Sequence, residues 1–321
     1  MSEYCIELSN ITKRFGKFTA VDDISLKLES GRIYGMVGPN GAGKSTTMAL
    51  IMGSLFPTSG NGSVFGHPLA SPEALKLLGY SPEFTSFYSD MKCYEYLWYM
   101  GCLSGLSSKD AARRTEELLE QFELKEHKDR KVAKFSTGMK KKVSLAQAMI
   151  HHPKILLLDE PTANLDPTSR QEILDTVWRM VQDEHLTVMI SSHVLTELET
   201  VISHVLMIDH GKLILNAPIA EAQEMFKQGI LWVDTSDNEK LLSGLAGTYN
   251  AELVPGEGVR ITTKEMNALK KDVVRLVYSG GMQLNRLSEE VLSLDSLYRQ
   301  MMEGEKNGSD TEKDASENAG A

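Results

Sequence analysis

The feature that most constrains this chain is a glycine-rich turn, Gly38 to Ser45, between an apolar run and a helical segment. The run, Ile33 to Val37, is short and continuously hydrophobic, as in a buried strand, and a helix is predicted to begin at Lys44. Glycines let successive backbone amides point at one anion, and the helix N-terminus adds partial positive charge. The turn is therefore predicted to cradle phosphate groups, with Lys44 neutralising them and the Ser45 hydroxyl reaching a magnesium ion.

Two later apolar runs end in polar side chains. Ile155 to Leu158 leads into Asp159 and Glu160, and Thr187 to Ser191 leads to His193. A helical pattern between the runs predicts parallel strands, whose carboxyl ends meet at one edge of a sheet. The two acids suit metal binding and activation of water, although paired acids after a strand also begin ordinary loops. By itself, the phosphate-binding turn is compatible with G proteins, kinases and helicases.

Composition excludes several classes of protein. The chain has 321 residues, enough for a large domain and a smaller companion, and its formal net charge of -10 disfavours non-specific binding to nucleic acid. Its three cysteines are too few and too scattered for a disulfide framework or a zinc site. The start of the sequence lacks the pattern of a secretory signal, and the apolar stretches are shorter than the roughly 20 residues of a spanning helix. The chain is expected to stay inside the cell.

A further motif, Phe135 to Met139, lies before the Asp-Glu strand. Together with the turn, the acid pair and His193, it resembles the ATP-binding cassette (ABC) family, whose signature sequence is LSGGQ. In that family the signature meets the γ-phosphate held by a second cassette, so hydrolysis requires a head-to-tail dimer. Ser136 suits the cap of a helix and Gly138 permits close approach. Phe135, Thr137 and Met139 depart from the family sequence.

Three more segments carry the resemblance. Ala163 to Asp166 resembles the D-loop, which links the two sites of the dimer, and Phe15 resembles the aromatic residue that stacks on adenine, although a plain core aromatic is a competing interpretation. Leu78 to Glu83 resembles the Q-loop, except that Glu83 replaces the usual glutamine. A carboxylate there could bind magnesium or position water, but it also repels phosphate.

The resemblance implies a set of site residues. Glu160, His193 and Lys44 are expected to be catalytic, and Ser45, Asp159 and Glu83 to hold Mg²⁺. ATP is expected to contact the following residues: Phe15, Gly38, Pro39, Asn40, Gly41, Ala42, Gly43, Lys44, Ser45, Thr46, Ser136, Gly138 and Asp166.

The resemblance also implies the fold class, which is α/β. Residues 1–217 are expected to form a P-loop NTPase domain of the ABC type, with a mostly parallel core sheet, an N-terminal antiparallel sheet and an inserted helical subdomain at about 84–152. A linker, 218–229, is expected to follow. Residues 230–302 alternate as strand, helix, strand, strand, helix, strand, which suggests a small α+β unit of the ferredoxin-like type.

The end of that unit is predicted in detail. A strand is expected at Met282 to Leu287 and a helix at Ser288 to Met302. Residues 303–321 contain no aliphatic side chain larger than alanine, so a disordered acidic tail is predicted. Leu292 to Tyr298 resembles the end of cassettes that serve two-component, ABC-2-type exporters.

The predicted function is that of an ATP-binding and ATP-hydrolysing subunit of an ABC transporter. It would use ATP and Mg²⁺, pair with an identical or related cassette, and power transport, with export favoured, through a separately encoded membrane permease. It would lie on the cytoplasmic face of the membrane, and no nucleic-acid partner is expected. Two alternatives stay open: a soluble cassette acting on a ribosome, nucleic acid or protein assembly, and a regulatory cassette that senses ATP without hydrolysing it.

Overall fold

A computed structural model describes residues 4–225 and 229–291. The chain divides into two compact units, Met1–Ile219 and Ala220–Ala321. Within the described residues, no helix is both long enough and apolar enough to cross a membrane.

The first unit is built around a six-stranded sheet with the order β10-β9-β3-β8-β7-β6. Its parallel strands are β3 (Ile33–Val37), β6 (Leu78–Ser81), β7 (Ile155–Leu158), β8 (Thr187–Ser192) and β9 (His204–Asp209), and β10 (Lys212–Pro218) is antiparallel to β9. β3, β7 and β8 are buried at every position, as expected for strands covered on both faces. The carboxyl ends of β3, β7 and β8 therefore meet at one edge of the sheet.

A second sheet, entirely antiparallel, comes mainly from the N-terminal part. Its order is β2-β1-β4-β5, formed by β1 (Tyr4–Phe15), β2 (Phe18–Glu29), β4 (Ser59–Val64) and β5 (His67–Pro68). Helix α1 (Lys44–Ile51) places Met48, Leu50 and Ile51 in a core cluster with residues of both sheets. This packing fixes the start of α1, and with it the phosphate-binding turn, against the core.

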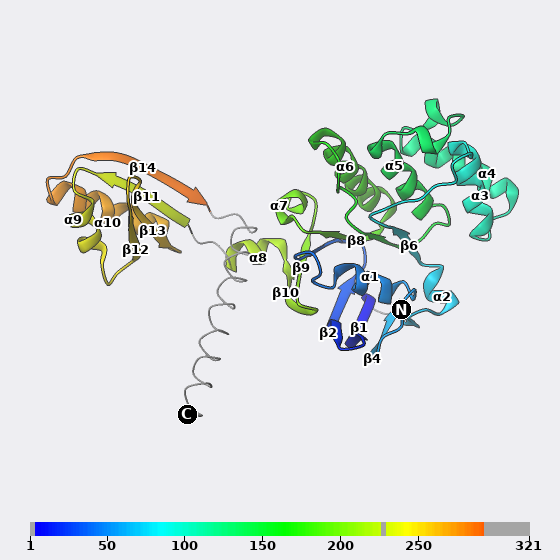
Figure 1. The fold of residues 1–321 in the computed structure, drawn as a ribbon, viewed down its shortest axis with the longest axis horizontal. Helices are drawn as coiled ribbons and strands as arrows, with labels where there is room; N and C mark the ends of the chain where they lie inside the picture. Colours follow the sequence, from blue (N-terminus) through cyan, green and yellow to red (C-terminus); the bar gives the residue numbers. More distant parts are fainter. Residues whose placement is uncertain (1–3, 226–228, 292–321) are drawn as a thin grey trace. The chain divides into compact units, whose positions relative to one another are not determined.

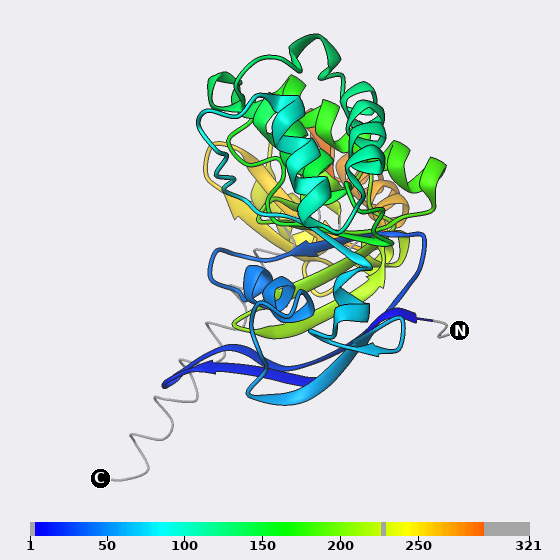
Figure 2. The same ribbon diagram turned by 90° about the vertical axis from the view of Figure 1, so that its right-hand side faces the viewer.

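Helices cover the other side of the six-stranded sheet. They are α3 (Cys93–Leu103), α4 (Ser108–Gln121), α5 (Thr137–Ala148) and α6 (Pro167–Glu184), with the short 3-10 turns Lys125–His127 and Val132–Lys134 between α4 and α5. Figures 1 and 2 show the N-terminal antiparallel strands and these helices on opposite sides of the sheet. Short helices α2 (Pro72–Leu75) and α7 (Leu195–Leu198) connect strands, and α8 (Ile219–Met225) follows β10.

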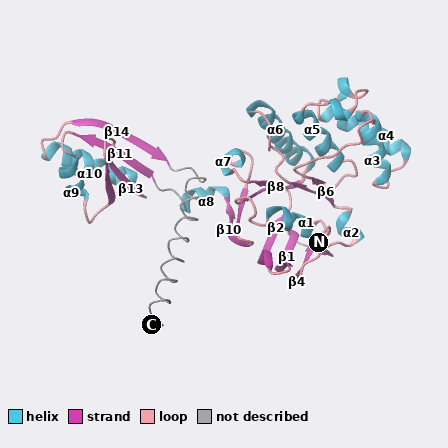
Figure 3. Cartoon of the chain, in the orientation of Figure 1, coloured by secondary structure: helices cyan, strands magenta, loops and turns pink. Residues whose placement is uncertain are grey.

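Beyond α8, the described part of the second unit is a four-stranded antiparallel sheet with two helices (Figure 3). Its elements are β11 (Gly229–Thr235), α9 (Asn238–Leu245), β12 (Asn250–Val254), β13 (Gly258–Thr263), α10 (Met266–Ser279) and β14 (Leu284–Val291), with the strand order β12-β13-β11-β14. Leu231, Val233 and Ile261 pack with Leu241 and Val273 of the helices in one core.

One prediction about this second unit is wrong. The helix expected from Ser288 begins where the structure has a strand, because β14 continues to Val291 in register with β11. Glu290 also accepts a hydrogen bond from the indole nitrogen of Trp232, at 2.9 Å, which holds this end of the strand to its neighbour. The rest of the predicted helix, the export-type ending and the predicted acidic tail lie outside the described residues.

Candidate functional site

The turn between β3 and α1 forms one wall of a cavity of about 380 Å³. The cavity is lined by Phe18, Ala20, Asn40, Gly41, Ala42, Gly43, Lys44, Ser45, Thr46, Glu83, Glu160, Ala163 and His193. Gly43 has a φ of 107°, a left-handed conformation that favours glycine, and a Cβ there would lie 2.5 Å from the Ala20 carbonyl oxygen. The close approach explains why a glycine precedes the helix.

Lys44 is buried at the base of the cavity, with 6% of the residue exposed. Its Nζ donates to the carbonyl oxygens of Gly38, at 2.6 Å, and Pro39, at 3.2 Å, and lies 3.6 Å from Glu160 Oε1. Burial lowers the pKa of Lys44, while Glu160 and Asp159 act in the opposite direction. The loop carbonyls therefore hold the ammonium group at the place where the turn would receive phosphate oxygens.

Asp159 and Glu160 leave β7 in different directions. Asp159 Oδ1 accepts hydrogen bonds from Ser45 Oγ, at 3.1 Å, and from Ser191 Oγ, at 2.6 Å. Glu160 has a φ of 46°, a left-handed conformation that costs a non-glycine residue about 1–3 kcal/mol and that occurs often at functional sites. Its amide donates to Ser191 Oγ at 2.9 Å, which stabilises the turn and lets the side chain reach the cavity.

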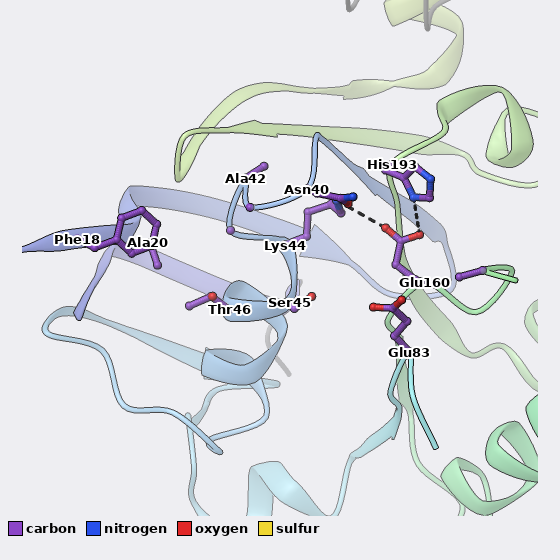
Figure 4. Close-up of a pocket in the computed structure, with 13 residues that line it drawn as sticks. Phe18, Ala20, Asn40, Ala42, Lys44, Ser45, Thr46, Glu83, Glu160 and His193 are labelled. Carbon is purple, nitrogen blue, oxygen red and sulfur yellow. Dashed lines mark hydrogen bonds and ion pairs between the residues drawn. The ribbon is translucent and has the colours of Figure 1, made fainter. Parts of the chain in front are cut away.

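His193 follows β8 and completes a row of three charged or titratable groups. Its Nδ1 lies 2.9 Å from Glu160 Oε2, opposite the oxygen that faces Lys44. Figure 4 shows Lys44 and His193 on either side of the Glu160 carboxylate, with Glu83 entering the cavity below it. Glu160 thus occupies the centre of the site, with a cation and an imidazole orienting its two oxygens.

Phe15 does not line the cavity, whereas Phe18 does. The two residues are directly paired across the β1–β2 hairpin, so their side chains lie on the same face of the sheet. Both are exposed, Phe15 to 48% and Phe18 to 61%, and Lys13 Nζ lies 5.1 Å from the centre of the Phe15 ring. Phe18 therefore stands at the rim of the cavity with the exposed Phe15 ring beside it, where the sequence predicted a single ring.

Ser136, Gly138 and Asp166 are not part of this cavity lining. Ser136 caps α5 by accepting from the Met139 amide at 3.3 Å, and Asp166 caps α6 by accepting from the Thr168 and Ser169 amides. The Ser169 amide is the largest cause of a lowered Asp166 pKa. A Cβ on Gly138 would lie 3.3 Å from Ser169 Oγ. The starts of α5 and α6 are thus packed together, and neither contributes Ser136, Gly138 or Asp166 to the cavity of the same chain.

Sequence reasoning missed Ser191 and Phe18 as members of this site. Ser191 is fully buried and serves both acids, donating to Asp159 and accepting from the Glu160 amide. The available signal was a hydroxyl residue near the carboxyl end of the strand beside β7. The signal for Phe18 was its position directly after the two-residue turn, Gly16 and Lys17, that pairs it with Phe15.

The fold and the site agree with comparisons to known proteins. Residues 21–163 match the family described as ABC transporter. The chain is 35% identical to the bacitracin transport ATP-binding protein BcrA of Bacillus licheniformis over 66% of this chain and 69% of that protein. It is 30% identical to the BcrA of Enterococcus faecalis over 94% of this chain and 97% of that protein. It is also 33% identical to the daunorubicin/doxorubicin resistance ATP-binding protein DrrA of Streptomyces peucetius, over 75% and 76%.

Solved structures share the fold of a large part of this chain. The structure of an ATP-binding subunit of an ABC transporter superposes with a TM-score of 0.62 at 26% identity, covering 69% of this chain and 93% of that one. The ADP conformation of MJ1267, an ATP-binding cassette of an ABC transporter, has the same TM-score at 24% identity and covers 69% and 95%. The sequence-based expectation of the family is confirmed: this chain belongs to the ABC transporter family, as an ATP-binding subunit whose ATPase activity is coupled to transport.

Proposed function

We propose that this subunit powers export by closing, as a dimer of cassettes, on ATP held in the cavity above the Gly38–Ser45 turn, with Glu160 as the general base. The observation that carries the proposal is the row formed by Lys44, Glu160 and His193 at the carboxyl edge of the parallel sheet. An ionised carboxylate between a cation and an imidazole keeps a fixed orientation, which is what activation of a single water molecule requires.

The turn, Lys44, Glu160 and His193 each have a role in this scheme. Amides of the turn and the Lys44 ammonium bind the β- and γ-phosphates, since the turn presents its N–H groups at a helix N-terminus. Glu160 accepts a proton from the attacking water, and the nearby His193 contacts the γ-phosphate. Hydrolysis then removes the group that the two cassettes grip together, which allows them to separate.

The donor set fits a magnesium ion. Within the described ranges, no group of three or more His, Cys, Asp or Glu side chains is arranged to hold a metal ion by itself. Magnesium needs no such group, because it is usually held by one or two protein oxygens together with phosphates and water. Ser45 Oγ and Asp159 Oδ1, 3.1 Å apart, would hold it, with Glu83 as a further candidate. When bound, the ion would neutralise phosphate charge.

The dimer is inferred from the residues that the cavity leaves out. Ser136 and Gly138 at the start of α5 and Asp166 at the start of α6 lie outside the lining, as they would if they met ATP bound to a partner cassette. The exposed Ser136 hydroxyl and the N-terminal amides of α5 suit an anion. The partner is an identical or a related cassette.

For the second unit we infer a ferredoxin-like fold. The supporting features are its βαββαβ order and the strand arrangement β12-β13-β11-β14, in which all neighbours are antiparallel. β11 and β12 run parallel, with α9 between them in sequence and β13 between them in the sheet.

The proposal of export rests on the functions for which the relatives are named. Proteins named for bacitracin transport and for daunorubicin and doxorubicin resistance resemble this chain over two thirds or more of their length. We therefore propose a separately encoded membrane permease as partner, which would place this subunit on the cytoplasmic face of the membrane.

One experiment separates this function from its alternatives. The full chain, tagged and expressed in its native host, is isolated from detergent-solubilised membranes with Mg-ATP, and steady-state phosphate release is measured. We expect phosphate release and co-purification of a protein with several apolar segments of about 20 residues. Recovery with ribosomes or a soluble assembly, without such a protein, would support the soluble cassette. A membrane complex without phosphate release would support the ATP-sensing cassette.

The aromatic pair at the rim gives a prediction about nucleotide affinity. Phe15→Ala and Phe18→Ala are each expected to raise the Kd for Mg-ATP about three- to tenfold, since an aromatic contact contributes about 0.5–1.5 kcal/mol. Calorimetry on the full chain measures the effect. Tyr278→Ala is the control, because Tyr278 is 89% exposed and lies on α10 of the second unit. Unchanged affinity in both phenylalanine variants would show that neither ring stacks on the nucleotide.

A further inference from the structure

Lys141 is a buried lysine one turn beyond the start of α5. It is 5% exposed, although lysine is almost never buried without a partner. Its Nζ donates to the carbonyl oxygen of Glu83 at 2.6 Å and to the carbonyl oxygen of Glu160 at 3.2 Å. A single ammonium group therefore joins three segments: the helix that begins at the signature, the loop after β6 and the turn after β7.

The next lysine on the same helix has a different environment. Lys142 forms ion pairs with Glu123 and Glu172, each at 3.1 Å, and both carboxylates are more than half exposed. These contacts fasten α5 to neighbouring parts of the helical layer and do not reach the cavity. Two adjacent lysines thus provide a matched pair, one turned toward the site and one away from it.

The carbonyl groups that Lys141 holds belong to functional residues. Glu160 is in a left-handed conformation, and its carbonyl oxygen also accepts from the Ala163 amide at 3.1 Å, which closes the turn. Glu83 lines the cavity beside Glu160. Burial lowers the pKa of Lys141, while the nearby carboxylates of Glu83, Asp159 and Glu160 act to raise it. The ammonium group thus lies near three acidic side chains of the site, but its hydrogen bonds go to the backbone carbonyls of Glu83 and Glu160.

We propose that Lys141 is a positioning residue for ATP hydrolysis, which ties the start of the signature helix to the Glu83 loop and to the turn that orients Glu160. Any displacement of α5 acts directly on both carbonyl groups, so the signature helix and the base move as one body. The inference deepens the proposed function, because it rests on Glu160 being the base.

The contacts distinguish this role from simple stabilisation of the core. An apolar side chain of similar length at position 141 would fill the same volume, but it would remove the ammonium donor from both carbonyl groups and leave the Glu160 carbonyl with the Ala163 amide alone. The resulting loss falls on the Glu83 loop and the Glu160 turn, because both carbonyls belong to them. Small displacements of a catalytic group are costly, since a misplacement of about 1 Å can reduce turnover about 100-fold.

The test compares Lys141→Met with Lys142→Met in the full chain, and adds Lys141→Arg as the conservative variant. Lys141→Met is expected to lower kcat about 10- to 100-fold while the KM for ATP changes less than about threefold. Lys141→Arg, which keeps a charged donor, is expected to restore most of kcat. Lys142→Met is expected to keep kcat within about twofold, because its ion pairs are exposed on the carboxylate side.

A second readout requires neither nucleotide nor turnover. Hydrogen exchange of the nucleotide-free protein is expected to accelerate in residues 83–90 and 160–165 of Lys141→Met and to stay unchanged there in Lys142→Met, since only the first variant releases these segments. If Lys141→Met does not fold, Lys141→Gln, which keeps an amide donor on a shorter side chain, takes its place with the same expectations.

The outcomes separate the two proposals. Wild-type kcat in Lys141→Met, an equal loss in Lys142→Met, or unchanged exchange in both segments each overturns the positioning role. In a Glu160→Gln background, Lys141→Met is expected to cause no further loss, because the base it positions is gone; additive losses also overturn the role. Normal turnover in Glu160→Gln alone would instead reject Glu160 as the base.

Discussion

Replacing Glu160 with glutamine is expected to lower ATP turnover by about 100- to 10,000-fold, the usual contribution of a general base, and to leave ATP binding nearly intact. Glutamine keeps the size of the side chain but cannot accept a proton from water. The substitution also removes the negative charge of the carboxylate. The ion pair with Lys44, whose Nζ lies 3.6 Å from Glu160 Oε1, is therefore lost, and so is the repulsion between the carboxylate and the phosphates. The variant should accumulate as an ATP-dependent dimer, measured by size-exclusion chromatography with and without Mg-ATP.

Glu83→Gln is the informative comparison, because the same cavity contains both carboxylates. Among the described residues, no pair of contacts orients the Glu83 carboxylate in this way. The two oxygens of Glu160 lie 3.6 Å from Lys44 Nζ and 2.9 Å from His193 Nδ1. A smaller loss of phosphate release is therefore expected in Glu83→Gln. If Glu83→Gln lost as much turnover as Glu160→Gln, or if Glu160→Gln turned over at the wild-type rate, the assignment of the base would have to be abandoned.

The fold was predictable where burial produces a simple pattern. Strands β3 and β7 are almost entirely apolar, and β8 has an apolar centre, because both faces of the sheet are covered, and their sequence runs predicted them within one residue. β14 could not be recognised over its full length, because Ser288, Glu289 and Glu290 are polar and pair with β11 at a sheet edge. The pattern there suits an exposed helix equally well, and only the pairing partner decides between them.

The site shows the same division between local and long-range information. The Gly38–Ser45 turn is determined locally, because its own residues specify both its backbone conformation and the start of the helix that follows. Ser191 and Lys141 act through residues 31 and 58 positions away, such as the Glu160 amide and the Glu83 carbonyl. Nothing in their own neighbourhood distinguishes them from an ordinary strand serine and helix lysine. Their roles follow from strand order and from the packing of α5.

Lys44→Ala is expected to weaken Mg-ATP binding about 10- to 1,000-fold and to abolish detectable turnover. The lysine is 6% exposed and its Nζ is held by the Gly38 and Pro39 carbonyls, so it is already in place to neutralise phosphate. Hydrogen bonds to charged groups contribute about 1.5–3 kcal/mol each, and every 1.4 kcal/mol is tenfold in Kd. Calorimetry measures the affinity directly.

Thermal unfolding gives a second measurement of the same loss, because a ligand that binds only the folded state raises the melting temperature in proportion to RT ln(1 + [L]/Kd). Saturating Mg-ATP should therefore raise the Tm of the wild-type protein and of Lys142→Ala, a partly buried lysine on α5 whose ion pairs lie outside the cavity. At the same Mg-ATP concentration the Tm of Lys44→Ala should rise less than that of the wild-type protein, because its Kd is higher. Lys44→Arg is expected to turn over as slowly as Lys44→Ala, since the planar guanidinium group of arginine cannot occupy the compact position between two loop carbonyls and Glu160.

An affinity of Lys44→Ala within twofold of the wild-type value would mean that the turn does not hold the phosphates through this ammonium group.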